Sequence, residues 1–133
     1  MSEPVKELRV SNDALNDPEE LQSRIEDEGY VFFKQLQDPD KLLNLRREVL
    51  TVIQEGGWLI QGTDPMDAIA DVSKQCTEGV SEYVDVYKNV QKLESFHDAG
   101  HWPEVTEVVD RIMGRPAMPH AQKIARIWFP QYT

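Results

Sequence analysis

Residues 38–57, DPDKLLNLRREVLTVIQEGG, decide how this sequence folds, because they contain a complete helix together with both of its ends. Asp38 and Pro39 are typical of a helix start, where an acidic cap precedes a proline in the first turn. The paired Gly56 and Gly57 end the pattern. Apolar residues recur between these ends at steps of three and four: Leu42, Leu45, Val49, Val52 and Ile53. The stretch therefore predicts an amphipathic helix with one buried face.

Upstream of this helix, the same signals predict another one. Asp17 is a suitable N-cap, Pro18 suits the first helical position, and Glu20 stands at the spacing of a capping box. Gly29 ends the pattern as a left-handed C-terminal residue. The next residues, 30–33 (YVFF), are β-branched and aromatic with no helical period, which predicts a short buried strand.

Downstream, residues 58–60 (WLI) form another short apolar stretch that favours extended structure. No period is visible over residues 61–79, which predicts a long irregular loop of the kind that is usually functional or mobile. Apolar spacing predicts a third helix over residues 80–97. A fourth helix is predicted to begin at Pro103 and to end at Gly114.

The chain finishes on residues 124–129, IARIWF, which predict a strand. Such a strand needs neighbours, yet the other strand candidates are two short pieces that cannot form a sheet covering four helices. We therefore expect an α+β chain that is cut partway through a larger fold. We also expect the last strand to be exposed and prone to self-association, since an unprotected apolar edge invites pairing.

Length and charge restrict the classes of function. A chain of 133 residues fits a single domain, and its net charge of −10 argues against nucleic-acid binding and against anionic membranes. The single cysteine, Cys76, cannot form an internal disulfide, which fits a reducing compartment. No 18-residue apolar run and no signal-peptide core occur in the sequence. A cytoplasmic location is the default expectation.

Few residues suggest chemistry on their own. His97 and His101 stand four apart in FHDAGH, a spacing that can bring two imidazoles to a metal. Gly100 and the nearby proline predict that the helix ends there, so hydrogen-bonded structural roles are the better interpretation. His120 is isolated before the last strand. Cys76 has no motif around it and is best interpreted as an inert thiol. No catalytic centre is visible from these residues.

Several longer segments, taken in order, are similar to one family. They are EDEGYVFFKQL, DPDKLLNLRREVL with EGGWL, YVDVYKNVQKLESFHDAGHWPEV, and VVDRIMGRPAMPHAQKIARIWFP. Together these segments cover nearly the whole chain. In this order the sequence resembles the phytanoyl-CoA dioxygenase family. The FH…GHWP and KIARIWFP stretches carry most of the resemblance.

The resemblance implies a double-stranded β-helix (jelly-roll, cupin-like) oxygenase, with this chain as its helix-rich N-terminal layer plus opening strands. That family holds Fe(II) with a His-x-Asp/Glu pair and a distal His, and leaves positions for 2-oxoglutarate and dioxygen. No His-x-Asp or His-x-Glu occurs here. We therefore expect no metal ligand in this chain, and neither Fe(II) nor 2-oxoglutarate bound to it alone. The resemblance further implies a cosubstrate-contacting role for Lys88, or for Asn89 in its place, and for Arg126.

These expectations give a first hypothesis and an alternative. The first is the N-terminal segment of a non-haem Fe(II)/2-oxoglutarate-dependent dioxygenase that hydroxylates a small organic substrate, with the iron-binding motif expected beyond residue 133. The alternative is a non-catalytic acidic helical module that binds a protein or an apolar ligand.

Overall fold

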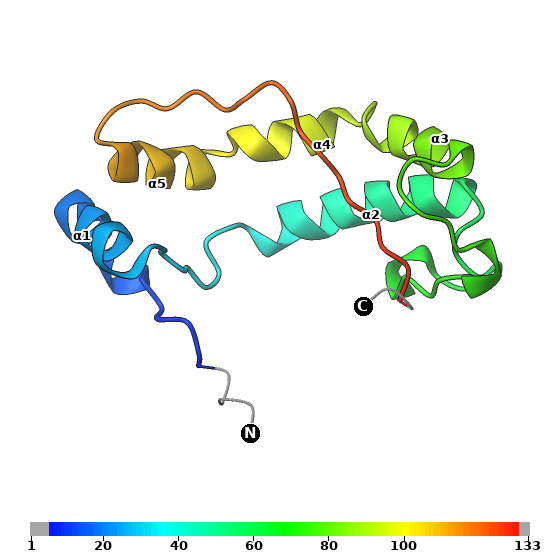
Figure 1. The fold of residues 1–133 in the computed structure, drawn as a ribbon, viewed down its shortest axis with the longest axis horizontal. Helices are drawn as coiled ribbons and strands as arrows, with labels where there is room; N and C mark the ends of the chain where they lie inside the picture. Colours follow the sequence, from blue (N-terminus) through cyan, green and yellow to red (C-terminus); the bar gives the residue numbers. More distant parts are fainter. Residues whose placement is uncertain (1–5, 131–133) are drawn as a thin grey trace. The chain divides into compact units, whose positions relative to one another are not determined.

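The computed structural model describes residues 6–130 and divides them into two compact units (Figure 1). Unit 1 contains the described residues up to Asp38 together with His101–Pro119, and unit 2 contains Pro39–Gly100 and the described residues from His120 onward. The α-helices are α1 (Pro18–Glu28), α2 (Pro39–Glu55), α3 (Ser81–Val90), α4 (Glu94–Asp98) and α5 (Pro103–Met113). Four short 3-10 turns accompany them: η1 (Asn12–Ala14), η2 (Pro65–Asp67), η3 (Val72–Lys74) and η4 (Ala99–His101).

In unit 1, α1 packs against α5, and the predicted ends of α1 are confirmed. The Asp17 side chain accepts a hydrogen bond from the backbone N–H of Glu20, and Gly29 ends the helix in the left-handed conformation with φ 79°. Leu21 is completely buried. The side-chain amide of Gln22 donates to the carbonyl of Arg111 at 3.3 Å, which fastens α1 to the end of α5.

A buried arginine organises the other side of α1. The guanidinium of Arg24 is only 5% exposed and donates two parallel hydrogen bonds to the Asp13 carboxylate, at 2.9 and 2.8 Å. A third bond runs from Arg24 to Glu20 at 2.7 Å. The fork of the guanidinium matches the carboxylate geometry, which makes such bidentate pairs strong and directional. Arg24 thereby fastens η1 to α1.

In unit 2, α2 packs against α3, α4 and η2. The prediction for α2 is confirmed at its end, where Gly57 adopts a φ of 78° after the last helical turn. The buried core lies between α2, α3, the irregular segment after α2 and the last described residues. Its members are Leu50, Ile53, Trp58, Leu59, Tyr83, Val86 and Phe129. Most of the core is therefore contributed by residues outside the strand candidates.

The α+β prediction, with opening strands of a jelly roll, is wrong. No strand occurs in the described part of the chain; single bridges join Val10 to Phe32 and Leu59 to Ala70. The physical reason is that Trp58, Leu59 and Phe129 pack in a core with side chains of α2 and α3, while residues 30–33 and 58–60 each make only one bridge. Residues 124–129 follow the helical layer of unit 2 and are not in a sheet (Figure 1).

The third predicted helix is also corrected. The single helix expected over residues 80–97 is interrupted after Val90, and α4 begins only at Glu94. The ring nitrogen Nε2 of His97 lies 2.8 Å from the carbonyl oxygen of Gln91, at the interruption. This contact satisfies a carbonyl that a continuous helix would have bonded internally. The loop over residues 61–79 and the helix from Pro103 to Gly114 are as predicted, with η2 and η3 inside the loop.

Among residues 6–130, no helix combines the length and apolar character that crossing a bilayer requires.

Candidate functional site

The centre of unit 2 is a cluster of three aromatic rings from three separate segments. The ring of Trp58 lies 5.7 Å from that of Tyr83 and 5.2 Å from that of Phe129, and both contacts are tilted. All three residues are at most 4% exposed. Tilted rings at these separations gain electrostatic energy beyond the burial of their area. The cluster therefore fixes the segment after α2, the helix α3 and the end of the described chain relative to one another.

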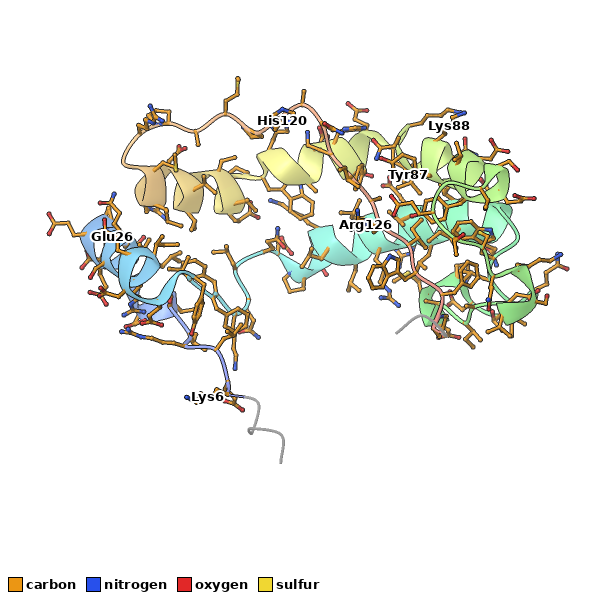
Figure 2. All side chains as sticks on the ribbon, viewed as in Figure 1. Lys6, Glu26, Tyr87, Lys88, His120 and Arg126 are labelled. Carbon is orange, nitrogen blue, oxygen red and sulfur yellow. The ribbon has the colours of Figure 1, made fainter. Side chains whose placement is uncertain are left out.

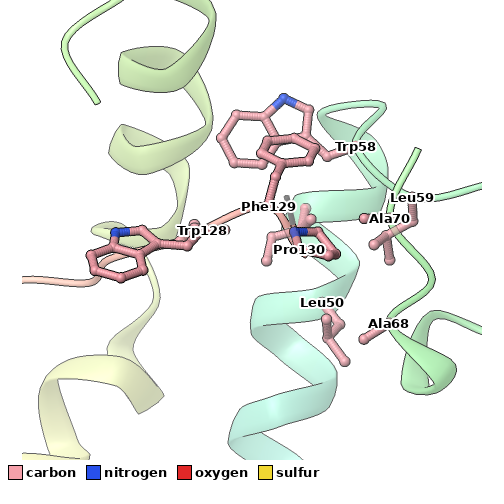
Figure 3. Close-up of a pocket in the computed structure, with 10 residues that line it drawn as sticks. Leu50, Trp58, Leu59, Ala68, Ala70, Trp128, Phe129 and Pro130 are labelled. Carbon is pink, nitrogen blue, oxygen red and sulfur yellow. The ribbon is translucent and has the colours of Figure 1, made fainter. Parts of the chain in front are cut away.

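An apolar pocket of about 170 Å³ opens beside this cluster (Figure 3). Helix α2 contributes one wall, the segment after it contributes a second, and the last described residues contribute a third. The lining residues are Leu50, Ile53, Trp58, Leu59, Ala68, Ala70, Ile127, Trp128, Phe129 and Pro130. None of these side chains carries a charge, so the pocket suits an apolar group and offers no general acid or base.

Residues 123–129 are held on the helical layer by two side-chain bonds from α3 and its C-terminal end. The hydroxyl of Tyr83 accepts a hydrogen bond from the backbone N–H of Ile127 at 3.2 Å. The side-chain amide of Gln91 donates to the carbonyl of Lys123 at 3.0 Å. Side chains along this segment alternate between covered and exposed positions, as in a strand that has one face on a core.

A second hollow shares Ile127 and Trp128 with the apolar pocket and includes a charged side chain, that of Glu78. Its lining residues are Cys76, Thr77, Glu78, Ile127 and Trp128. Burial raises the pKa of the Cys76 thiol, and the nearby Glu82 carboxylate raises it further. A raised pKa keeps the thiol protonated, which makes it a poor nucleophile. This agrees with the interpretation of Cys76 as inert.

The two residues suggested as cosubstrate contacts lie apart. Lys88 is exposed on the outer side of α3, and Figure 2 shows it away from Arg126. Arg126 is largely exposed and forms an ion pair with Glu78, whose Oε2 lies 3.4 Å from Nε of Arg126. Asn89 lies next to Lys88 and is exposed as well. Neither Lys88 nor Arg126 lines the apolar pocket, so the structure does not bring them to a common site.

The three histidines make separate local contacts. His97 bonds the Gln91 carbonyl and lies edge-on to Phe96, with 5.5 Å between the ring centres. Nδ1 of His120 accepts a hydrogen bond from the backbone N–H of Gln122 at 3.0 Å. His101 ends the turn η4 and is the first residue of the second segment of unit 1, whereas His97 belongs to unit 2. The pair four residues apart thus lies on a helix that ends between its members.

Iron and 2-oxoglutarate do not fit the residues present. Among the described residues, no group of three or more His, Cys, Asp or Glu side chains lies close enough to hold a metal ion. His97, the most buried candidate, already uses its Nε2 on a backbone carbonyl. A facial triad of two histidines and one carboxylate is the minimum that this chemistry requires. Residues 6–130 therefore do not provide this triad.

Sequence reasoning missed most of the pocket. Leu50, Ala68 and Ala70 were not singled out, because small or ordinary apolar residues in a loop carry no motif. A usable signal was Trp58 directly after two glycines, since a large aromatic residue at a helix end is usually buried. Comparison with protein-family models, with curated proteins and with solved structures finds no match to this chain, so the residues themselves must carry any functional argument.

Proposed function

We propose that this chain is the helical part of a non-haem Fe(II)/2-oxoglutarate-dependent oxygenase of the phytanoyl-CoA dioxygenase kind, cytoplasmic and acting on a small organic substrate. The support is the ordered set of segments that resemble this family. Fe(II) and 2-oxoglutarate would supply the oxidation of an unactivated carbon. The ligands for that iron would come from other parts of the protein, since residues 6–130 contain no group of three or more potential ligand side chains that could hold a metal ion.

One observation carries the proposal furthest: segments that resemble the family meet in one core. EGGWL contributes Trp58, YVDVYKNVQ contributes Tyr83 and Gln91, and KIARIWFP contributes Ile127 and Phe129. The rings of Trp58, Tyr83 and Phe129 pack together, and Tyr83 and Gln91 both bond the backbone of the last segment. Segments far apart in sequence that share a core are parts of one structural unit, which supports the resemblance as a whole.

The proposed contribution of this chain is structural and apolar. The pocket beside the aromatic cluster lies against residues 127–130 and has only apolar side chains around it. Such a surface can take up an apolar part of a substrate, while the oxidising group is supplied from elsewhere in the protein. Lys88 and Arg126 are both exposed, and Arg126 is paired with Glu78, so the proposal assigns neither of them to a dicarboxylate site in this arrangement.

The natural reading frame and its full product test the proposal. We expect codons for His-x-Asp or His-x-Glu roughly 5–20 residues after Thr133, since one loop of ordinary length must intervene. The full product should convert 2-oxoglutarate to succinate only when Fe(II) is present. Residues 1–133 alone should give no heat of binding with Fe(II) or 2-oxoglutarate at micromolar concentrations under anaerobic conditions. A stop codon after Thr133, or tight stoichiometric iron binding by His97 and His101, would contradict the proposal.

The alternative function is a module that binds an apolar ligand. The apolar pocket beside the aromatic cluster favours it when the family resemblance is set aside. An apolar cavity of about 150 Å³ in another protein stays dry and binds benzene. Titration with toluene, followed by the fluorescence of Trp58 and Trp128, tests this function. Ala70→Leu would fill the pocket and should abolish the response, whereas Ala99→Leu, outside the pocket, should leave it intact. Equal responses from both variants would contradict specific binding.

A further inference from the structure

Residues 123–129 are extended and have one face covered and one face open. Along this segment, Ala125 and Ile127 are half-buried and Phe129 is buried, while the residues between them are exposed. Ile124 is 60% exposed and Trp128 is 64% exposed. Two large apolar side chains therefore lie on the open face, two positions to either side of Arg126.

The two edges of the segment also differ. In an extended chain, the N–H and C=O groups of alternate residues point to opposite edges. The bonds from Tyr83 and Gln91 reach Ile127 and Lys123, which are both odd-numbered, so they occupy one edge. The other edge consists of the N–H and C=O groups of Ile124, Arg126 and Trp128. Across residues 6–130, no backbone group pairs with this edge.

An edge of this kind is a template for a further strand. Natural proteins protect such edges with lysine, with proline or with a covering element. Proline is present only where the segment ends, at Pro119 and Pro130, and Lys123 is turned toward the covered face. Among the central residues of the edge, Arg126 is the one charged side chain that could protect it, and Ile124 and Trp128 are apolar. The open stretch is long enough for a short ladder.

We propose that a second copy of this chain pairs with residues 126–128, antiparallel and centred on Ile127, with Ile124 opposite Pro130 at each end. In this register, Arg126 of each copy lies opposite Trp128 of the other. The guanidinium of Arg126 is paired with Glu78 only through an exposed contact of 3.4 Å, which is weak in water. Across the ladder each guanidinium therefore meets an indole ring, and the two-fold symmetry makes this contact twice. The alternative centre, on Arg126, places the two Arg126 side chains opposite each other, and like charges directly opposite are destabilising. The contact of Arg126 with Trp128 therefore favours a second copy of this chain as the partner. The repulsion between two Arg126 side chains favours the register centred on Ile127.

Charge also predicts how this pairing responds to salt. Each chain carries a net charge of −10, so two copies repel each other at long range. Added salt screens this repulsion, while the short contacts of the ladder are affected less. The dimer should therefore become tighter between low and physiological ionic strength, which is opposite to the behaviour of a complex held by surface ion pairs.

Light scattering during size-exclusion chromatography, repeated at several concentrations, tests the association. The full chain should be dimeric at high concentration. Trp128→Lys places a lysine opposite Arg126 twice and should weaken the dimer by roughly tenfold or more in Kd. Met118→Lys makes the same type of change at another exposed apolar position and should leave the dimer intact. A monomer at all concentrations, or equal weakening by both variants, would overturn the proposal.

Disulfide trapping tests the register separately. On a Cys76→Ser background, Arg126→Cys chains mixed with Trp128→Cys chains should cross-link to each other. Ile124→Cys chains mixed with Trp128→Cys chains, which both keep Arg126, should cross-link far less, because only the register centred on Arg126 places positions 124 and 128 opposite each other. Preferential linking of Ile124→Cys to Trp128→Cys would overturn the assigned register. The cross-linking result does not depend on the oxygenase proposal. That proposal is tested by a different measurement, the iron-dependent conversion of 2-oxoglutarate by the full product.

Discussion

The two units of this chain are stabilised by different kinds of interaction. Unit 1 contains a buried arginine, Arg24, which holds η1 to α1 through the carboxylates of Asp13 and Glu20. Unit 2 has an aromatic core, in which Trp58, Tyr83 and Phe129 pack together. Charge pairs weaken when a partner is protonated, whereas apolar burial is insensitive to pH. The units should therefore respond differently to acid and to truncation of single side chains.

The largest expected effect is in unit 2. Phe129→Ala removes a ring that is 3% exposed and contacts Trp58, leaving a cavity in the core. We expect the free energy of unfolding of unit 2 to fall by about 3–5 kcal/mol, as is typical for a buried phenylalanine. Hydrogen exchange of backbone amides, measured separately for the two units, checks this. The adjacent Trp128→Ala should cost less than about 1 kcal/mol because this side chain is mostly exposed.

Breaking the arginine cluster should have a smaller effect, confined to unit 1. Arg24→Met removes three hydrogen bonds but leaves no buried charge, because Asp13 is largely exposed and can return to water. Arg24→Met should therefore lower the protection of backbone amides in unit 1. This loss should be smaller than the loss that Phe129→Ala causes in unit 2. Arg115→Met, at an exposed arginine of the same unit, is the matched control and should change nothing. Equal losses in the two variants would show that Arg24 has no special role.

Acid should affect the same cluster. The hydrogen bonds from Arg24 lower the pKa of Asp13 from 3.8 to about 2. Because the pKa is lowered in the folded state, this contribution to stability is present above about pH 4 and is lost as the pH falls through about 2. Carboxyl chemical shifts during an acid titration should give this pKa directly. In Arg24→Met, Asp13 should titrate near its ordinary value; an unchanged titration would contradict the assigned cause.

Sequence reasoning identified helices well and strands poorly, and unit 2 shows the reason. The caps at Asp17 and Gly29 are local signals, so α1 follows from its own residues. An apolar run such as residues 124–129 predicts a strand, whereas the structure shows a segment outside any sheet whose alternate side chains are covered. The run does not specify what covers them. A strand requires a partner at a distance, whereas these residues are covered by α2, α3 and the loop after α2.

The apolar pocket illustrates the same limit for the candidate site. Its walls come from α2, from residues 58–70 and from residues 127–130, which contact one another only after folding. No spacing in the sequence relates Ala68 or Ala70 to Trp128. His97 and His101, in contrast, have a suggestive spacing but separate contacts, because the helix ends between them. Tertiary packing decided both outcomes.

A single hydroxyl offers a finer comparison inside unit 2. Tyr83 and Tyr87 lie on α3 with stacked rings, 6.4 Å between their centres, but only the hydroxyl of Tyr83 accepts the N–H of Ile127. Tyr83→Phe keeps the ring and leaves that N–H without its partner. We expect a loss of about 0.5–1.5 kcal/mol in the free energy of unfolding. Tyr87→Phe should be close to neutral, and chemical denaturation of both variants gives the difference.

The smallest expected effects concern backbone strain, of which each unit has one example. Gln35 in unit 1 and Ala68 in unit 2 have positive φ values of 55° and 52°, a conformation that disfavours any residue with a Cβ. Gln35 is exposed, so Gln35→Gly removes the strain without loss of packing and should stabilise unit 1 by roughly 0.5–1 kcal/mol. Ala68 packs against the core of unit 2, so Ala68→Gly also loses a methyl contact and should gain less. Denaturant midpoints of both variants give the comparison. A larger gain at Ala68 than at Gln35 would mean that its methyl group contributes nothing to the core, contrary to the packing around the pocket.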